Sequence, residues 1–172
     1  NDKTFKPPFK ITLWGNCNSC FYNARMTDIM PYIEFDSHIS SLNHAFSNSR
    51  VKAIPHINAS NAALLSNSFD SEYIESIIGL TVAASTRFSN AFGGARGLKH
   101  VIFDGTIGQN GLNLQWSTLL DKESITSIIN TLSATTSGLS VTLSATAVNN
   151  AFSADEWNAF IATKPNWTIS LV

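Results

Sequence analysis

The sequence predicts an α/β fold: a short solenoid of about four coils, each 23–25 residues long with one parallel strand, closed by a C-terminal α/β cap. Two observations lead to this prediction. Four segments in the first two thirds of the chain align on a phenylalanine, and after Gly105 the repeat stops and helix and strand patterns replace it. The chain therefore divides into a linker at 1–10, the solenoid at 11–111 and a cap at 112–172 that is continuous with it.

The repeat is anchored on four phenylalanines spaced 25, 23 and 23 residues apart, namely Phe21, Phe46, Phe69 and Phe92. The position four residues before each anchor holds Cys17, Leu42, Leu65 or Phe88. The position directly before each anchor holds Cys20, Ala45, Ser68 or Ala91. Apolar residues also recur five and eight positions after the anchor, shifted by one residue in the fourth segment, and then at Ile33, Ile57, Leu80 and Phe103.

This spacing predicts how the segments pack. One unit is too small to bury its own apolar face, so neighbouring units must stack, with the phenylalanines in one ladder and the Leu and Ile side chains in another. The parallel strands are predicted at 26–35, 51–58, 74–82 and 98–105. The residues leading into each phenylalanine are expected to form the opposite wall, as a short helix or 3₁₀ turn in which Asn and Ser satisfy backbone groups.

The repeat length and one segment point to a family. A period of 23–25 residues lies within the range of leucine-rich repeats. The segment LNHAFSNSRVKAIPHI resembles the units of the BspA-like leucine-rich repeats, in which a phenylalanine precedes a Leu-x-x-Ile-Pro run. The resemblance covers about residues 14–110, and only Ile54-Pro55 keeps the Ile-Pro pair intact. It implies a non-catalytic interaction or adhesion module on a surface.

The last third of the chain reads as a cap that hides the final face of the core. Alternation at Leu112, Leu114 and Trp116 and again over 139–143 predicts strands. Asp121 is placed to cap a helix that includes Ile125, Ile128, Ile129 and Leu132. A capping box, Ser153-x-x-Glu156, begins a second helix that Lys164-Pro165 ends, and the closing NWTISLV reads as a strand with Trp167, Ile169 and Leu171 on one face. The order resembles the helix–strand–helix–strand segment that often closes BspA-like repeats.

The two cysteines form a Cys17-x-x-Cys20 pair inside the first segment. Cys17 takes the place of Leu, Leu and Phe in the other segments, and Cys20 takes the place of Ala, Ser and Ala. Because free cysteine packs as a small hydrophobe, we expect both to fill the core. A disulfide or redox pair is the main alternative. A metal site would need two more ligands, and the chain has no second cysteine pair.

Catalytic motifs are missing from the sequence. The histidines, His38, His44, His56 and His100, match no zinc motif, and the chain contains no G-x-S-x-G elbow and no phosphate loop. Asp28, Glu75 and Asp104 lie in strand segments where a pair of carboxylates could form across neighbouring coils, as a glycosidase requires. We therefore expect no enzyme activity, cofactor or metal, and keep a polysaccharide-degrading enzyme as a less favoured alternative.

The outward side of the strands, or strand face, is the candidate binding face, because solenoids commonly bind through such surfaces. Its candidate residues are Lys52, His56, Glu75, Ile78, Lys99, His100, Ile102 and Asp104. Eleven basic and twelve acidic residues without a cluster give no electrostatic footprint for nucleic acid. No apolar run approaches the length that a transmembrane helix needs.

Taken together, these features favour a bacteriophage virion protein of the tail, fibre or head decoration. Three features support this interpretation: the family resemblance, the composition and the first residue. Ser, Thr and Asn make up roughly a third of the chain. The chain starts at Asn1 instead of Met, which suggests a processed or partial chain. The expected partners are other virion proteins or a host-surface glycan or protein, with a homo-oligomer possible. The alternative is a secreted or cell-surface bacterial adhesin of the same repeat class.

Overall fold

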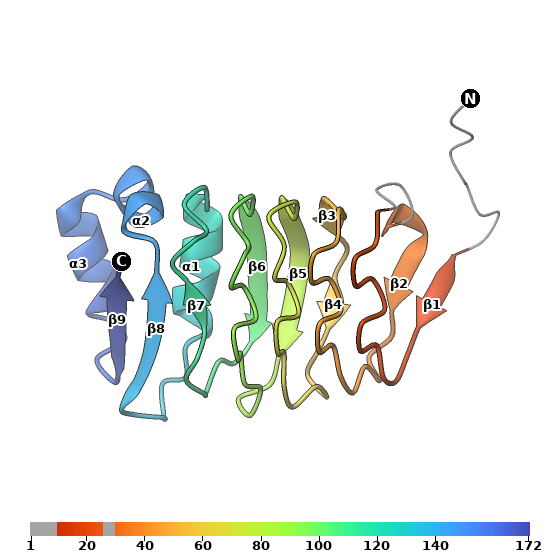
Figure 1. Ribbon diagram of the computed structural model, residues 1–172. Coiled ribbons are helices and arrows are strands. Elements are labelled where there is room, and N and C mark those ends of the chain that lie inside the picture. Colours follow the sequence, from red (N-terminus) through yellow and green to blue (C-terminus); the bar gives the residue numbers. More distant parts are fainter. Residues whose placement is uncertain (1–9, 26–29) are drawn as a thin grey trace.

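The protein has a mixed α/β fold in which short parallel strands of the described residues form three small sheets (Figure 1). The computed structural model describes residues 10–25 and 30–172. The elements in chain order are β1 (Ile11–Leu13), the 3₁₀ helix η1 (Met30–Tyr32), β2 (Ile33–Phe35), β3 (Ala53–Ile54), β4 (Ile57–Asn58), β5 (Ser76–Val82), β6 (His100–Gly105), β7 (Asn113–Leu114), α1 (Lys122–Thr131), β8 (Leu139–Leu143), α2 (Ala145–Ala151), α3 (Ala154–Ile161) and β9 (Trp167–Leu171). The predicted linker lies outside the described residues except for Lys10.

The phenylalanine anchors form the ladder that their spacing predicts. Phe46 stacks on Phe21 with ring centroids 5.1 Å apart and on Phe69 at 5.8 Å, and Phe69 stacks on Phe92 at 5.2 Å. The backbone repeats the same step, since the N–H groups of Phe21, Phe46 and Phe69 each donate to the carbonyl just before the next anchor, at 2.8 Å. This layer of turns, the turn layer, forms one side of the molecule.

The turns themselves are not the short helices that the sequence allowed. The residue two positions before each anchor has a positive φ: Ser19 (56°), His44 (55°), Asn67 (49°) and Asn90 (53°). A left-handed residue interrupts a helix, and Asn tolerates this conformation better than most residues. As expected, Asn side chains tie neighbouring turns together, because the Asn18 Oδ1 accepts the backbone N–H of Asn43 at 3.0 Å.

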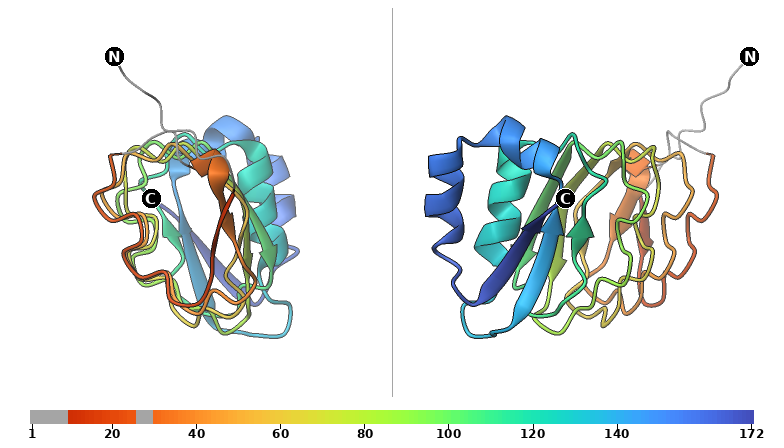
Figure 2. Two further views of the ribbon diagram at one scale, coloured as in Figure 1. Left: turned by 90° about the vertical axis from the view of Figure 1, so that its right-hand side faces the viewer. Right: turned by 60° about the vertical axis from the view of Figure 1, so that its left-hand side comes forward.

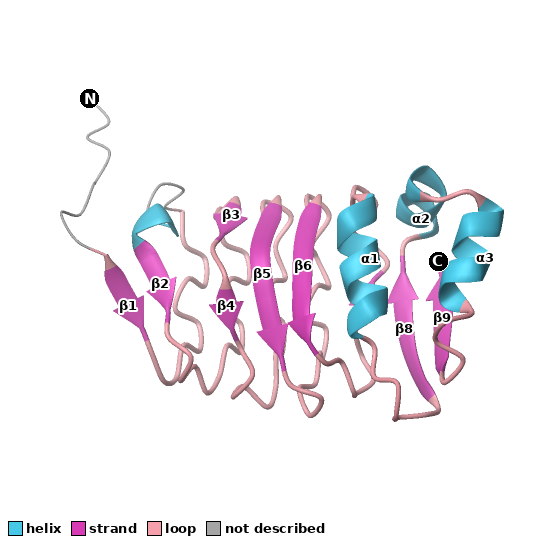
Figure 3. Ribbon diagram, turned by 180° about the vertical axis from the view of Figure 1, so that it is seen from behind, coloured by secondary structure: helices cyan, strands magenta, loops and turns pink. Residues whose placement is uncertain are grey.

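The strand layer lies on the opposite side of the core (Figures 2 and 3). β3 and β4 both pair with β5, and β6 pairs along the other edge of β5, all in parallel. The predicted strand at 51–58 is broken in two at Pro55, which lacks the N–H that a continuous ladder needs. In the predicted strand at 26–35, residues 30–32 are η1 and only 33–35 is strand; Met26, Asp28 and Ile29 lie outside the described residues.

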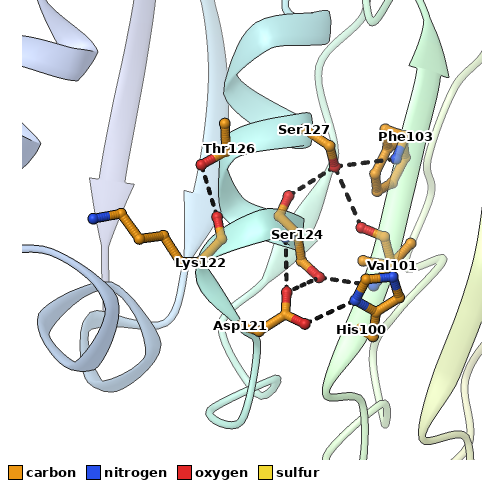
Figure 4. Close-up of polar contacts among 8 residues, drawn as sticks. All are labelled: His100, Val101, Phe103, Asp121, Lys122, Ser124, Thr126 and Ser127. Carbon is orange, nitrogen blue, oxygen red and sulfur yellow. Dashed lines mark hydrogen bonds and ion pairs between the residues drawn. The ribbon is translucent and has the colours of Figure 1, made fainter.

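Helix α1 covers the outer edge of β6, where another strand would otherwise pair (Figure 4). The Ser124 hydroxyl accepts the backbone N–H of Val101 at 2.8 Å, and the Ser127 hydroxyl accepts that of Phe103 at 3.1 Å. Two side chains of a helix thus satisfy backbone donors that a sheet edge would leave free. Strands return in the turn layer, where β7, β8 and β9 form a three-stranded parallel sheet.

The predicted helix caps of the last third are confirmed, but three other features differ from the prediction. Asp121 accepts from the Ser124 N–H at the start of α1, and the capping box of Ser153 and Glu156 begins α3. The strand predicted through Trp116 ends at Leu114, and the Trp116 side chain is exposed because the chain turns there, with Ser117 N–H donating to the Leu114 carbonyl. Helix α2 was not predicted. On β9, only Trp167 is buried, so the expected apolar face is incomplete.

Candidate functional site

The candidate binding face begins with a row of charges across three segments. Glu75 lies between Lys52 and Lys99, with Oε1 3.2 Å from the Lys52 Nζ and Oε2 2.7 Å from the Lys99 Nζ. Hydrogen bonds and positive charge from Lys99 first, and from Lys52 second, lower the pKa of Glu75. The three side chains are partly exposed, and two lysines with one carboxylate leave the row with a net charge of +1 that solvent largely screens.

The middle of the face is formed by a β-bulge. Ile77 and Leu80 of β5 pair with Val101 and Phe103 of β6, so two residues of β5 stand opposite the single residue Ile102. The extra residue pushes Ile78 outward, and its side chain is 63% exposed, which is unusual for a large apolar residue in a strand.

His56 lies over the same bulge. A β-carbon on Gly79 would lie 2.5 Å from the His56 ring, so the glycine makes room for the imidazole. The His56 Nε2 is 2.9 Å from the Thr81 Oγ1, which holds the ring against β5. The ring is therefore positioned by its neighbours, although its own surface remains exposed.

His100 and Asp104 lie at the two ends of β6. The His100 Nδ1 is 2.7 Å from the Asp121 Oδ2, and the other oxygen of Asp121 accepts the Ser124 N–H at 2.8 Å (Figure 4). Partial burial alone would raise the pKa of Asp121, but hydrogen bonds from Ser124 and His100 together lower it. The contacts of His100 are thus with the start of α1, where it supports the helix cap.

The carboxylates considered for a glycosidase pair are not brought together among the described residues. Glu75 lies beside Lys99, and Asp104 follows Lys99 by five residue steps along β6. At the rise of an extended chain this corresponds to about 16 Å, beyond the range for a pair of glycosidase carboxylates. Asp28 lies outside the described residues.

The two cysteines lie in different environments, and both are free thiols. The core position predicted for Cys17 is confirmed, since its side chain is 2% exposed. The prediction for Cys20 is wrong: its side chain is exposed, because no described segment packs against the outer side of the first turn. Burial, with a hydrogen bond to Cys20, raises the pKa of the Cys17 thiol to about 12.

We expect the two thiols to differ in reactivity. At pH 8 the raised pKa keeps Cys17 far less ionised than an ordinary thiol, and only the thiolate is nucleophilic. Iodoacetamide should therefore modify Cys20 and leave Cys17 intact, as read by mass spectrometry of the folded protein. Both should react in denaturant. Equal modification in the folded state would contradict the burial of Cys17.

A hollow that the sequence analysis did not single out is lined by residues that lie between the phenylalanine anchors and the starts of β3, β5 and β6. The starts of these strands are uppermost in Figure 1. Its volume is about 650 Å³, and its lining includes Arg25, Arg50 and Arg96. Each of these arginines follows its phenylalanine anchor by four positions, in the first, second and fourth segments. The recurrence of arginine at this position is the sequence signal that could have indicated the hollow. We call this hollow the arginine groove.

The described part of the chain shows no metal site and no membrane helix. Among these residues, no group of three or more His, Cys, Asp and Glu side chains is placed to hold a metal ion. None of the helices in the described ranges is long and apolar enough to cross a bilayer. No protein-family model matches the chain, and searches of curated proteins and of solved structures give no match either.

Proposed function

We propose that residues 11–111 form a short leucine-rich-repeat solenoid of the BspA-like type, and that the protein is a non-catalytic interaction or adhesion module. The observation that carries the proposal is a regular repeat in space: equivalent side chains and backbone groups of successive segments lie next to one another at a constant step. Stacked phenylalanine rings and backbone hydrogen bonds follow this step inside the molecule. Outside, the row Lys52–Glu75–Lys99 follows it as well.

This regular spacing supports a role in binding. It gives less support to a role in catalysis. Side chains from neighbouring segments are held at fixed intervals on a continuous surface, which is how repeat proteins build extended binding faces. The exposed Ile78 supplies an apolar centre between the charged row and Asp104.

The proposed setting is a bacteriophage virion, in a tail, a fibre or a head decoration. The partner would be a host-surface glycan or protein, or another virion protein. Support comes from the resemblance of the repeat and from a chain rich in Ser, Thr and Asn, with only 13% charged residues.

Immunogold electron microscopy on the source culture tests this setting. An antibody against the domain is applied to purified particles and to cell envelopes, with preimmune serum as the control. Gold at discrete sites on virus particles is the expected result. Gold on bacterial envelopes together with unlabelled particles would overturn the virion assignment and identify a bacterial surface adhesin.

A further inference from the structure

The arginine groove carries positive groups that have no described counter-ion. Within residues 10–25 and 30–172, no carboxylate oxygen lies within 4.0 Å of the guanidinium nitrogens of Arg25, Arg50 or Arg96. The lysines of the strand face behave differently, because Lys52 and Lys99 are both paired with Glu75. The described structure therefore leaves the charges in the groove available to a ligand.

Two of these guanidinium groups are held in place by aromatic rings. Arg50 lies over the ring of Tyr73 at 5.5 Å from its centroid, and Arg96 lies over the ring of Trp116 at 5.3 Å. A cation–π contact holds the plane of the guanidinium and leaves its N–H edge free for hydrogen bonds. That edge is the fork that matches the two oxygens of a carboxylate or sulfate.

The groove also presents hydrogen-bond acceptors. Asp70 and Glu72 are part of its lining, so three guanidinium groups and two carboxylates leave a net charge of +1. A β-carbon on Gly94 would lie 2.4 Å from the Asp70 Oδ1, so the glycine lets this carboxylate reach across the neighbouring segment. Asn48 adds an amide to the lining. A ligand made only of acceptors, such as inorganic sulfate, would be repelled by the two carboxylates.

We propose that the arginine groove binds an acidic saccharide, a sugar that carries a carboxylate or a sulfate together with free hydroxyl groups. Arg50 and Arg96 each bind an acidic group of the saccharide, Asp70 and Glu72 accept hydrogen bonds from the hydroxyls, and the exposed Tyr73 ring borders the sugar. A volume of about 650 Å³ lies in the usual range for small-molecule sites. This site is separate from the strand face and does not depend on it.

Isothermal titration calorimetry at low salt tests the proposal with three probes. Trigalacturonic acid carries carboxylates, a sulfated galactan oligosaccharide carries sulfates, and maltotriose is neutral. Binding of one or both acidic probes, with no heat from maltotriose and weaker binding as salt rises, is the expected result, and the probe that binds identifies the acidic group. Equal binding of maltotriose, no binding of either acidic probe, or binding of sodium sulfate as tight as that of the acidic sugars would overturn it.

Substitutions locate the site. Arg50→Gln and Arg96→Gln should each weaken binding by about tenfold or more, because each removes charged hydrogen bonds. The matched control is Arg87→Gln, an exposed arginine outside the groove, which should leave affinity unchanged, as should Ile78→Asp on the strand face. Circular dichroism checks the fold of each variant. An equal loss with Arg87→Gln would show nonspecific charge attraction and contradict the proposal.

Asp70→Asn separates a sugar from a simple anion. Loss of the carboxylate should weaken the binding of an acidic sugar, because a hydroxyl loses its charged acceptor. An increase in affinity would show that the groove only attracts negative charge, and would overturn the assignment to a saccharide. Neither result depends on where the protein is displayed, so a failure here and a failure of the virion assignment are told apart.

Discussion

Phe69→Ala is expected to lower the free energy of unfolding by ~3–5 kcal/mol, because it leaves a cavity in a fully enclosed stack. Phe69 has no exposed surface, and its ring lies between those of Phe46 and Phe92 at 5.8 and 5.2 Å. Phe46→Ala should cost as much, since this ring is also buried and has neighbours on both sides. Urea denaturation followed by circular dichroism measures both values.

Phe21→Ala is the matched control for the ladder. Phe21 stacks on Phe46 but is only partly buried at the end of the row, so the cavity that it leaves opens toward solvent and its loss should cost clearly less. Costs below about 1 kcal/mol at both Phe46 and Phe69 would contradict the stacked ladder. A larger cost at Phe21 than at Phe69 would place the centre of the core elsewhere.

Ser124→Ala is expected to cost ~1–3 kcal/mol, the range for leaving a buried backbone donor unpaired. The Ser124 hydroxyl accepts the N–H of Val101 at 2.8 Å and donates to the Asp121 Oδ1 at 2.6 Å, so one atom joins the edge of β6 to the start of α1 (Figure 4). Amide hydrogen exchange should show faster exchange at Val101, and urea denaturation should show the lower stability.

Thr126→Ala on the same helix is the control for this change. Its hydroxyl donates to the Lys122 carbonyl within α1 and reaches no strand, so the cost should stay within about 0.5 kcal/mol. If both variants lose equal stability, the effect belongs to the helix alone. Unchanged exchange at Val101 in Ser124→Ala would contradict the role of Ser124 in covering the edge of β6.

Much of the local structure followed from side-chain spacing. The phenylalanine step predicted the ring ladder because stacked segments must bring identical positions together. The caps of α1 and α3 were predicted because a capping side chain and the N–H that it accepts are neighbours in sequence. The strand break at Pro55 is likewise a local effect, although the sequence analysis had placed one continuous strand there.

Other features depended on long-range contacts. Helix α2 was missed because its seven residues have no clear apolar period, and Ser144, which caps it, resembles many other serines of the chain. Cys20 was assigned to the core by its place in the repeat. Only the structure shows that the first turn lacks a described neighbour on its outer side. Cys20 is therefore exposed, whereas Ala45, at the equivalent position of the next segment, is buried.

The candidate sites divide in the same way. The sequence placed Lys52, Glu75 and Lys99 on one face, and the structure joins them in one charged row. It could not show that Arg50 and Arg96, which belong to nonadjacent segments, line one hollow. That arrangement depends on the third segment, whose Tyr73 stands where the others carry arginine.

The sequence by itself determined the period, the stacked anchors, the positions of β5, β6 and β8, and two helix caps, since these depend on residues that are close in sequence or that recur at a constant step. The tertiary structure decided the bulge that exposes Ile78, the covering of β6 by hydroxyls of α1, and the lining of the arginine groove. The physical reason is that each of these depends on the register between segments, and a shift of one residue would move every side chain to a different neighbour.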